Sequence, residues 1–367
     1  MSLIKVKSRG TDNVTGRKNL IINGAMQIAQ RGTSFTSVSS VTYHLDRFQY
    51  YVTGMDELRT TVSQDSSVPA GADSGFSKSL KIDCTTAESA LAAAENLRVW
   101  QKVEAQDLVR LGYGTSGAKT TTLSFYVKSS LTGTYAVSFW CQDPNRNIAK
   151  TYTINAANTW EKKTITIPGD TGGAGINSDN GEGMRINWFL NAGSNFTSVN
   201  TNNQWDGFVS GRHAFGHTAA WGTNTSHDFF LTGVQFEVGN SASDFEHRSF
   251  GEELALCQRY YVNYGLGSNA PSVVALGRDA QYGAIRGTQV SFPVTMRANP
   301  TVVIQSGSAN SMDRYGRGQE TCYPQAEGIT TFGFDTIRSR NSNGSDRTWT
   351  DSGLYMNRAG YSAEAEL

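Results

Sequence analysis

The sequence has little charge and no excess of either sign. Charged residues make up 17% of the 367 residues, and 32 lysines and arginines balance 32 aspartates and glutamates. A nucleic-acid-binding protein gains much of its affinity by releasing counterions from phosphates with clustered basic residues. The balanced composition therefore argues against a nucleic-acid partner.

Cysteines are few and widely separated. The four, Cys84, Cys141, Cys257 and Cys322, form no C-x-x-C pair. Free cysteines in a reducing compartment behave as small apolar side chains, whereas disulfide frameworks belong to oxidising compartments. We therefore expect buried thiols in a protein made in the cytoplasm.

Long apolar runs are also missing. No stretch approaches the ~20 apolar residues of a membrane-spanning helix, and the opening MSLIKVKSRG lacks the apolar core of a signal peptide. We therefore expect no membrane insertion.

The sequence also lacks the common catalytic motifs, including G-x-S-x-G, a Walker loop and H-E-x-x-H. His213 and His217 stand in H-x-x-x-H, but Gly211 and Gly216 beside them disfavour the helix that a metal pair needs. We predict that the protein is not an enzyme. A pair of carboxylates that meets only in three dimensions leaves a polysaccharide depolymerase open as a less favoured alternative.

Glycine and aromatic residues are abundant, as in β-rich proteins with many turns. Several short segments alternate like strands, and glycine- and asparagine-rich loops separate them. These segments include residues 120–129, 135–141, 160–168, 184–190 and 229–238. The pattern predicts an antiparallel β-sandwich. Glu88 to Arg98, by contrast, has a composition that favours a short helix.

The spacing of apolar residues changes after Val238. Ser249 and Glu252 read S-x-x-E, the capping box at the start of a helix. Leu254, Cys257 and Tyr261 then fall on one helical stripe. Because so short a helix is unstable alone, we predict that this stripe contacts other chains around a trimer axis, or that each helix caps its own sandwich.

Two groups of motifs resemble known proteins. GVQFEVG and DFEHRSFGEELALCQRYY at residues 233–261, with NLIINGAMQIAQRGTSF and YHLDRF near the start, are similar to segments of bacteriophage virion proteins of the tail-fibre type. The strand segments between residues 20 and 239 resemble the jelly roll of carbohydrate-binding modules. The resemblance implies a homotrimeric virion protein, made in the host cytoplasm, that contacts other tail proteins and a host surface glycan.

The resulting prediction is an all-β protein with a short connecting helix. Residues 1–18 form an N-terminal virion-docking arm, residues 19–248 an antiparallel jelly-roll β-sandwich, residues 249–265 a helical joint, and residues 266–367 a smaller, sandwich-like distal β domain. The function predicted from this arrangement is host attachment by binding a surface glycan. Host contact is expected at the polar distal loops 306–320 and 338–347 rather than at the jelly roll, unless these are ordinary solvated loops. The alternative is a structural fibre or adaptor, in tail or head, that spaces and trimerises other parts without binding a ligand.

Trp140 is the first candidate for glycan contact, because it falls on the polar side of its strand, where its ring could stack on a sugar. Burial under a loop or a neighbouring subunit is the alternative. Trp188 alternates with apolar residues and is assigned to the core. Further glycan candidates lie in polar loops, where aromatic residues could also simply pin the loop: Trp205, Trp221, Arg314, Tyr315, Arg317, Arg340 and Arg347.

A cofactor is not expected, with one exception. Asp170, Asp179 and Glu182 supply carboxylate oxygens in and beside a glycine-rich loop, and carboxylates are the ligands that calcium prefers. Their spacing matches no fixed calcium loop. They are retained as candidates for a structural calcium site.

Overall fold

The computed structural model describes most of the first 264 residues and separate segments of the remainder. The described residues are 17–71, 75–200, 203–264, 274–278, 285–287, 289–306, 311–314, 318–321, 323–334, 336–340, 355–357 and 359–367.

The first unit is a β-sandwich of two antiparallel sheets. Sheet A has the order β1-β4-β5-β13-β7-β10, and its strands are β1 (Ser34–Val38), β4 (Arg59–Asp65), β5 (Ser79–Thr86), β7 (Thr121–Ser129), β10 (Glu161–Ile167) and β13 (Asp228–Val238). Sheet B has the order β12-β9-β8-β11-β6-β3-β2, with β2 (Thr42–Tyr43), β3 (Gln49–Thr53), β6 (Asn96–Glu104), β8 (Gly133–Cys141), β9 (Arg146–Ile154), β11 (Glu182–Ala192) and β12 (Asp206–Gly207). The predicted antiparallel sandwich is confirmed.

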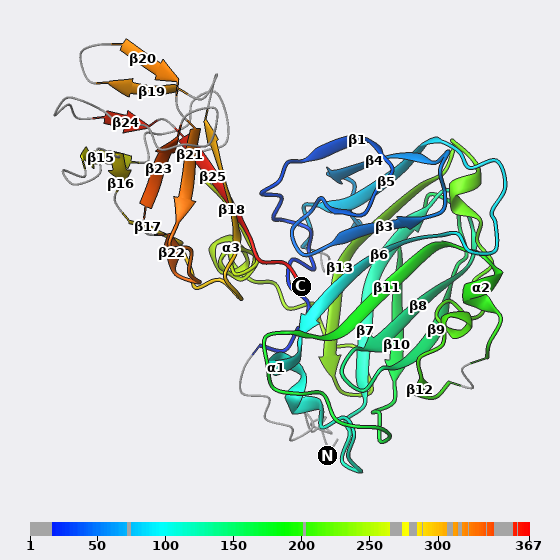
Figure 1. The fold of residues 1–367 in the computed structure, drawn as a ribbon. Helices are drawn as coiled ribbons and strands as arrows, with labels where there is room; N and C mark the ends of the chain where they lie inside the picture. The colour runs from blue at the N-terminus through cyan, green and yellow to red at the C-terminus, as the bar shows by residue number, and fades with distance from the viewer. Residues whose placement is uncertain are drawn as a thin grey trace, which may run out of the picture.

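The chain crosses repeatedly between the sheets from β5 to β13, as in a jelly roll (Figure 1). Because side chains alternate along a strand, each strand directs every second side chain toward the opposite sheet. Phe125 of sheet A meets Trp188 of sheet B edge-on, with ring centroids 6.0 Å apart. Trp188 is fully buried, as its alternation predicted.

Three of the four cysteines lie in the described part of the chain. Cys84, Cys141 and Cys257 are free and buried, as expected of small apolar side chains. Cys322 lies outside the described residues.

Short helical segments lie at the edges of the sandwich. They are α1 (Ala105–Leu108), α2 (Ser194–Thr197) and the 3-10 turns η1 (Val109–Leu111), η2 (Ser210–Arg212) and η3 (Trp221–Thr223). The helix predicted near Glu88 to Arg98 is wrong, because β6 begins at Asn96 and pairs with β3 and β11. Burial between two neighbouring strands outweighs local helix propensity in that segment.

The helix α3 (Phe250–Gln258) follows the sandwich. The Ser249 side chain accepts a hydrogen bond from the Glu252 amide at 3.3 Å, as the capping motif predicted. The helix ends earlier than expected, because Tyr261 begins the strand β14 (Tyr261–Tyr264). The predicted helical joint of residues 249–265 is therefore too long at its C-terminal end.

The second unit is also built from antiparallel strands. One sheet has the order β14-β25-β18, and its other strands are β18 (Thr301–Ser306) and β25 (Ala359–Glu364). A second has the order β20-β19-β24-β15-β16-β23-β21, with β15 (Val274–Arg278), β16 (Ile285–Gly287), β19 (Ser311–Arg314), β20 (Gly318–Thr321), β21 (Tyr323–Glu327), β23 (Thr336–Arg340) and β24 (Tyr355–Asn357). The strands β17 (Val290–Ser291) and β22 (Gly333–Phe334) pair separately.

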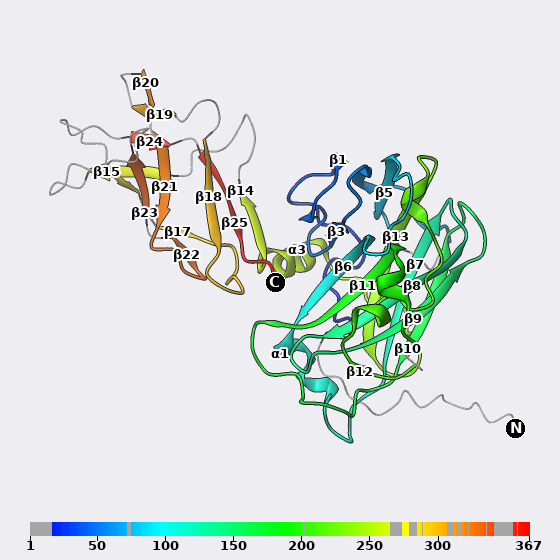
Figure 2. The ribbon, with the colours of Figure 1, turned by 45° about the vertical axis from the view of Figure 1, so that its right-hand side comes forward.

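The end of the chain returns to the sandwich. Glu366 pairs with Arg47 and with Arg31, and the Lys102 ammonium donates to the Leu367 carbonyl oxygen. Figures 1 and 2 both place the C-terminus and α3 between the two units. Within the described residues, no helix has the length and apolar character needed to cross a membrane.

Candidate functional site

The outer face of sheet B carries a row of aromatic rings and guanidinium groups. Val99, Ile186 and Phe139 face the core, so their neighbours in each strand point to the opposite side. We call these outward residues the sheet B row: Tyr51 on β3, Arg98 and Trp100 on β6, Arg185 on β11 and Trp140 on β8.

Rings and guanidinium groups alternate along the sheet B row. The guanidinium carbon of Arg98 lies 4.4 Å from the Tyr51 ring centroid and 4.7 Å from that of Trp100. That of Arg185 lies 4.2 Å from Trp100 and 5.0 Å from Trp140. Cation–π contacts of this kind hold the side chains across four neighbouring strands in one order.

Trp140 lies on the outer face, as its alternation predicted, and is half-buried. Phe208, from the loop after β12, stacks on the Trp140 ring with centroids 4.3 Å apart and an angle of 21°. The Trp140 Nε1 donates to the Asn145 side-chain oxygen at 3.1 Å. Phe208 thus covers one face of the Trp140 ring, as in the alternative of burial under a loop, and both rings stay half-buried at one end of the row. No local sequence pattern indicates this pairing.

The loop that carries Phe208 is held down by two buried histidines. His217 accepts a hydrogen bond from the Ala136 amide at 3.1 Å through Nδ1, and its Nε2 bonds the Ala219 carbonyl oxygen at 2.7 Å. Burial lowers the pKa of His217 to about 4, and burial together with Arg98 also lowers the pKa of His213. Both imidazoles are therefore neutral packing groups that fix the loop on sheet B.

Arg98 lies on this face without a carboxylate partner among the described residues. It is 7% exposed, and no ion pair joins it to any acidic residue in the described part of the chain. Its Nε and Nη1 atoms are buried without a hydrogen-bond partner. Burial, and then the neighbouring Arg185, lower the pKa of Arg98 to about 9. Arg185, by contrast, donates twice to Glu182 at 2.8 Å.

Two other tryptophan predictions are wrong. Trp221 is fully buried in the sandwich core. Trp205 is 8% exposed, meets Tyr113 edge-on and donates to the Pro168 carbonyl oxygen at 2.7 Å. Both rings pin the polar loop onto the sandwich and have no face free for a sugar.

The glycan-contact candidates in the distal loops stay predictions. Arg314 ends β19 and Arg340 ends β23. Their side chains, together with Tyr315, Arg317 and Arg347, lie outside the described residues.

The three calcium candidates do not converge. Asp170 accepts from the Arg146 guanidinium at 2.7 Å, Asp179 accepts from the Gly181 amide at 2.7 Å, and Glu182 holds Arg185. Across the described residues, no three acidic, histidine or cysteine side chains gather as a metal site. The calcium prediction at these positions is wrong, because each carboxylate is taken by its own local partner.

The predicted oligomer stripe is covered by its own chain. Cys257 is fully buried in a cluster with Ile22, Ile28 and Tyr260, and Leu254 packs against that cluster. Tyr261 lies under Arg31, whose guanidinium carbon is 3.6 Å from the ring centroid. Cys257 and Tyr261 are therefore covered within the chain, as in the alternative in which the helix caps its own sandwich, whereas the half-buried Leu254 as a contact between chains stays a prediction.

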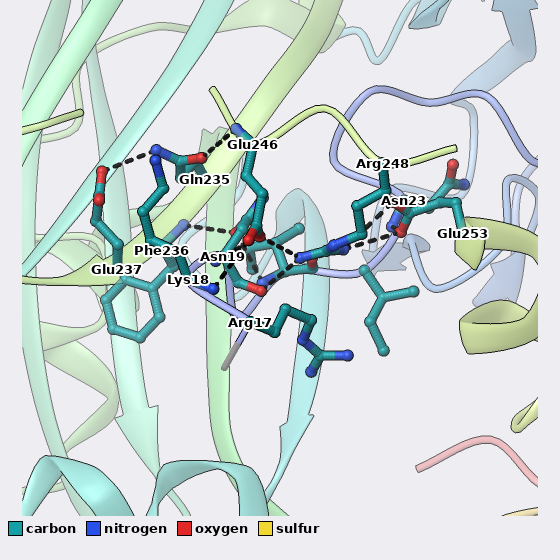
Figure 3. Close-up of polar contacts among 12 residues, drawn as sticks. Arg17, Lys18, Asn19, Asn23, Gln235, Phe236, Glu237, Glu246, Arg248 and Glu253 are labelled. Carbon is teal, nitrogen blue, oxygen red and sulfur yellow. Dashed lines mark hydrogen bonds and ion pairs between the residues drawn. The ribbon is translucent and has the colours of Figure 1, made fainter. Parts of the chain in front are cut away.

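The motifs that resemble phage virion proteins meet in one buried contact, which we call the motif seam (Figure 3). Arg248, with a side chain 4% exposed, donates to the Asn19 and Ile21 carbonyl oxygens at 2.7 and 3.1 Å. It also pairs with Glu246 at 2.9 Å and with Glu253 at 3.3 Å. The seam thus fastens the first described residues to the segment before α3.

Backbone groups complete the motif seam. Glu246 accepts from the amides of Lys18 and Asn19 at 3.0 and 2.8 Å, and the Asn19 side chain bonds the Phe236 amide and the Val234 carbonyl. Arg17 and Lys18, which were assigned to the arm, therefore belong to the sandwich; Arg17 also pairs with Asp107 at 3.3 Å. The motif residues account for the fold at this junction.

No protein-family model matches the chain, and no curated protein sequence matches it. Among solved structures, 60% of the chain is similar to the enzymatically active domain of tailspike protein 4 of bacteriophage CBA120, with 12% identity and a TM-score of 0.31. That match covers 21% of the tailspike chain, so this chain spans about a fifth of it.

Two carbohydrate-binding modules are similar over most of their own length. A family 11 module of a Clostridium thermocellum cellulase matches 59% of this chain and 98% of its own, with 10% identity and a TM-score of 0.29. The CBM22-1 xylan-binding domain of Paenibacillus barcinonensis Xyn10C matches 57% of this chain and 94% of its own, with 11% identity and a TM-score of 0.24. The sandwich assignment itself rests on the strand order given above.

Proposed function

We propose that this chain is a bacteriophage virion protein of the tail-fibre type that attaches to its host by binding a surface glycan on the sheet B row. The half-buried Trp140 ring and the Arg185 guanidinium, whose carbon lies 5.0 Å from the ring centroid, are the more accessible part of the row and carry the proposal. Aromatic rings stack on the C–H faces of sugars, and guanidinium groups donate hydrogen bonds to sugar oxygens. The motif resemblance of residues 19–35 and 233–261 supports the virion assignment.

The row is organised before any ligand arrives. Glu182 fixes the Arg185 guanidinium through two hydrogen bonds, and Phe208 fixes the Trp140 ring by stacking. A site whose side chains are already held loses less conformational entropy on binding. We therefore place the first sugar contact at Trp140 and Arg185.

A glycan array tests this proposal with a matched pair of tryptophan variants. Trp140→Ala removes a ring from sheet B, whereas Trp160→Ala removes one beside Phe230 of sheet A. We expect the wild-type protein to bind at least one glycan, Trp140→Ala to weaken that binding about tenfold, equivalent to ~1.4 kcal/mol, and Trp160→Ala to leave it unchanged. An array without any bound glycan, or equal losses in both variants, would contradict the proposal.

A structural fibre or adaptor without a ligand is the second candidate. One observation favours it: the rings of the row cover one another, and Trp100 is only 4% exposed. In that role the row would stiffen sheet B, and the array would stay empty.

Three further parts of the proposal concern assembly and chemistry. The protein would form a homotrimer, which light scattering of the purified chain measures. Host contact would extend to the distal loops 306–320 and 338–347, and exchanging these loops with those of a relative infecting another host should shift host range. Attachment would proceed without catalysis, so incubation with host polysaccharide should release no new reducing ends.

A further inference from the structure

Arg98 differs from the other buried arginines. Among the described residues, Arg47, Arg98 and Arg212 are buried. Arg47 pairs with Glu366, and Arg212 pairs with Asp206 at 2.9 Å. Arg98 has aromatic neighbours and the like-charged Arg185, but none of the described carboxylates forms an ion pair with it.

A buried charge without a counterion is unfavourable, because desolvation is not repaid by an ion pair. The Tyr51 and Trp100 rings and the Tyr51 hydroxyl offset part of this cost. The Nε and Nη1 atoms of Arg98 still have no hydrogen-bond partner, so the cost of burying them is not offset. On the same face the Asn187 side-chain oxygen is also buried without a partner. The sheet B row therefore holds an excess of positive charge and unused polar groups in one place.

We infer that the sheet B row recognises a negatively charged sugar, whose carboxylate or phosphate group is balanced by Arg98 and Arg185. This inference rests on the proposed function and names its ligand class. Arg185, the more exposed of the two guanidinium groups, makes the direct contact with the anion. Arg98 lies beside the same Trp100 ring and supplies the unbalanced charge.

Two pairs of polymers test the inference. The first pair is polygalacturonate and its carboxyl-reduced form, and the second is a phosphomannan and its dephosphorylated form. Affinity for each is measured by calorimetry with wild-type protein and with two variants that each remove one positive charge. Arg98→Gln removes the charge from the sheet B row, and Lys162→Gln removes it from an exposed position of sheet A. Circular dichroism checks that both variants are folded.

We expect at least one charged polymer to bind at least tenfold more tightly than its neutral form. A loss of affinity on carboxyl reduction identifies a carboxylate ligand, and a loss on dephosphorylation identifies a phosphate ligand. Arg98→Gln should remove most of this preference, whereas Lys162→Gln should keep it. Added salt should weaken the preference, as it does for exposed charge interactions.

Three outcomes would overturn the inference. Equal affinity for charged and neutral forms would contradict an anionic ligand while leaving glycan binding intact. A folded Arg98→Gln variant that keeps the full preference would contradict recognition of the anion by Arg98 in the sheet B row. Failure to bind all four polymers, with neutral glycans bound on an array, would also exclude the anionic class. An empty array would instead contradict the proposed function itself.

Discussion

The motif seam and the sheet B row each contain a nearly buried arginine, but only the arginine of the seam has carboxylate partners among the described residues. Arg248 in the seam has two carboxylates and two carbonyl oxygens as partners. Arg98 in the row has aromatic rings but no carboxylate in the described part of the chain. The same residue type thus serves a fully bonded structural junction in one place and an incompletely bonded buried cluster in the other.

We interpret this difference as one between residues that stabilise the fold and residues that bind a ligand. A buried polar network is stable when every member is bonded, whereas an incomplete network costs stability. Functional sites are where proteins tolerate such a cost. The comparison therefore predicts large stability losses from changes in the seam and small ones in the row.

The largest effect is expected from Arg248→Met. This change leaves Glu246 and Glu253 without their buried cation and frees two carbonyl oxygens. We expect the free energy of unfolding to fall by about 3–5 kcal/mol, measured by urea denaturation. Arg59→Met serves as a control, because Arg59 donates to backbone carbonyls near its own position, and should cost ~1 kcal/mol or less. Equal losses in the two variants would mean that the seam has no special role.

The next largest effect should come from Gly24→Ala. A Cβ atom at Gly24 would lie 2.1 Å from the Val234 carbonyl oxygen, so the seam must separate to admit it. We expect a loss of about 3 kcal/mol. Gly251→Ala in α3 is the matched control, since a Cβ there meets open space, and should be neutral or stabilising by ~0.5–1 kcal/mol. A tolerated Gly24→Ala would show that this close approach is relaxed in solution.

A third effect concerns the loop that carries Phe208, whose attachment to sheet B should depend on pH through His217. Because burial lowers the pKa of His217 to about 4 from 6.5, the unfolded chain takes up its proton first as pH falls. The contribution of His217 is complete above pH 6.5 and is lost between pH 6.5 and 4. It amounts to roughly 3 kcal/mol across that window. Unfolding at several pH values should show a smaller decline in His217→Gln than in wild type, and equal declines would refute the neutral packing role.

The sequence predicts those features that depend on local alternation or capping. Trp188 in the core, Trp140 on the outer face and the Ser249 cap all follow from neighbours a few residues away. The burial of Trp205 and Trp221 could not be predicted in this way. A loop of polar composition gives no indication of which of its rings will reach the core.

The partners of the buried arginines could not be predicted from the sequence either. Arg248 meets Asn19 across 229 positions, and Arg98 lies beside Arg185 only because β6 pairs with β11. Whether a basic residue finds a carboxylate depends on strand order, which periodicity does not determine. Likewise, Tyr261 fits the helical stripe of α3 by spacing, but it pairs with β25 as a strand residue.

The smallest expected change in stability is also the most direct test of the comparison. We would measure the free energy of unfolding of Arg98→Gln by urea denaturation, beside the wild-type protein without ligand. If Arg98 is kept for a ligand, removal of its unbalanced charge should leave stability unchanged or raise it by up to ~1 kcal/mol. A loss of about 3–5 kcal/mol, like that expected for Arg248→Met, would show instead that Arg98 is a structural residue and would contradict the account.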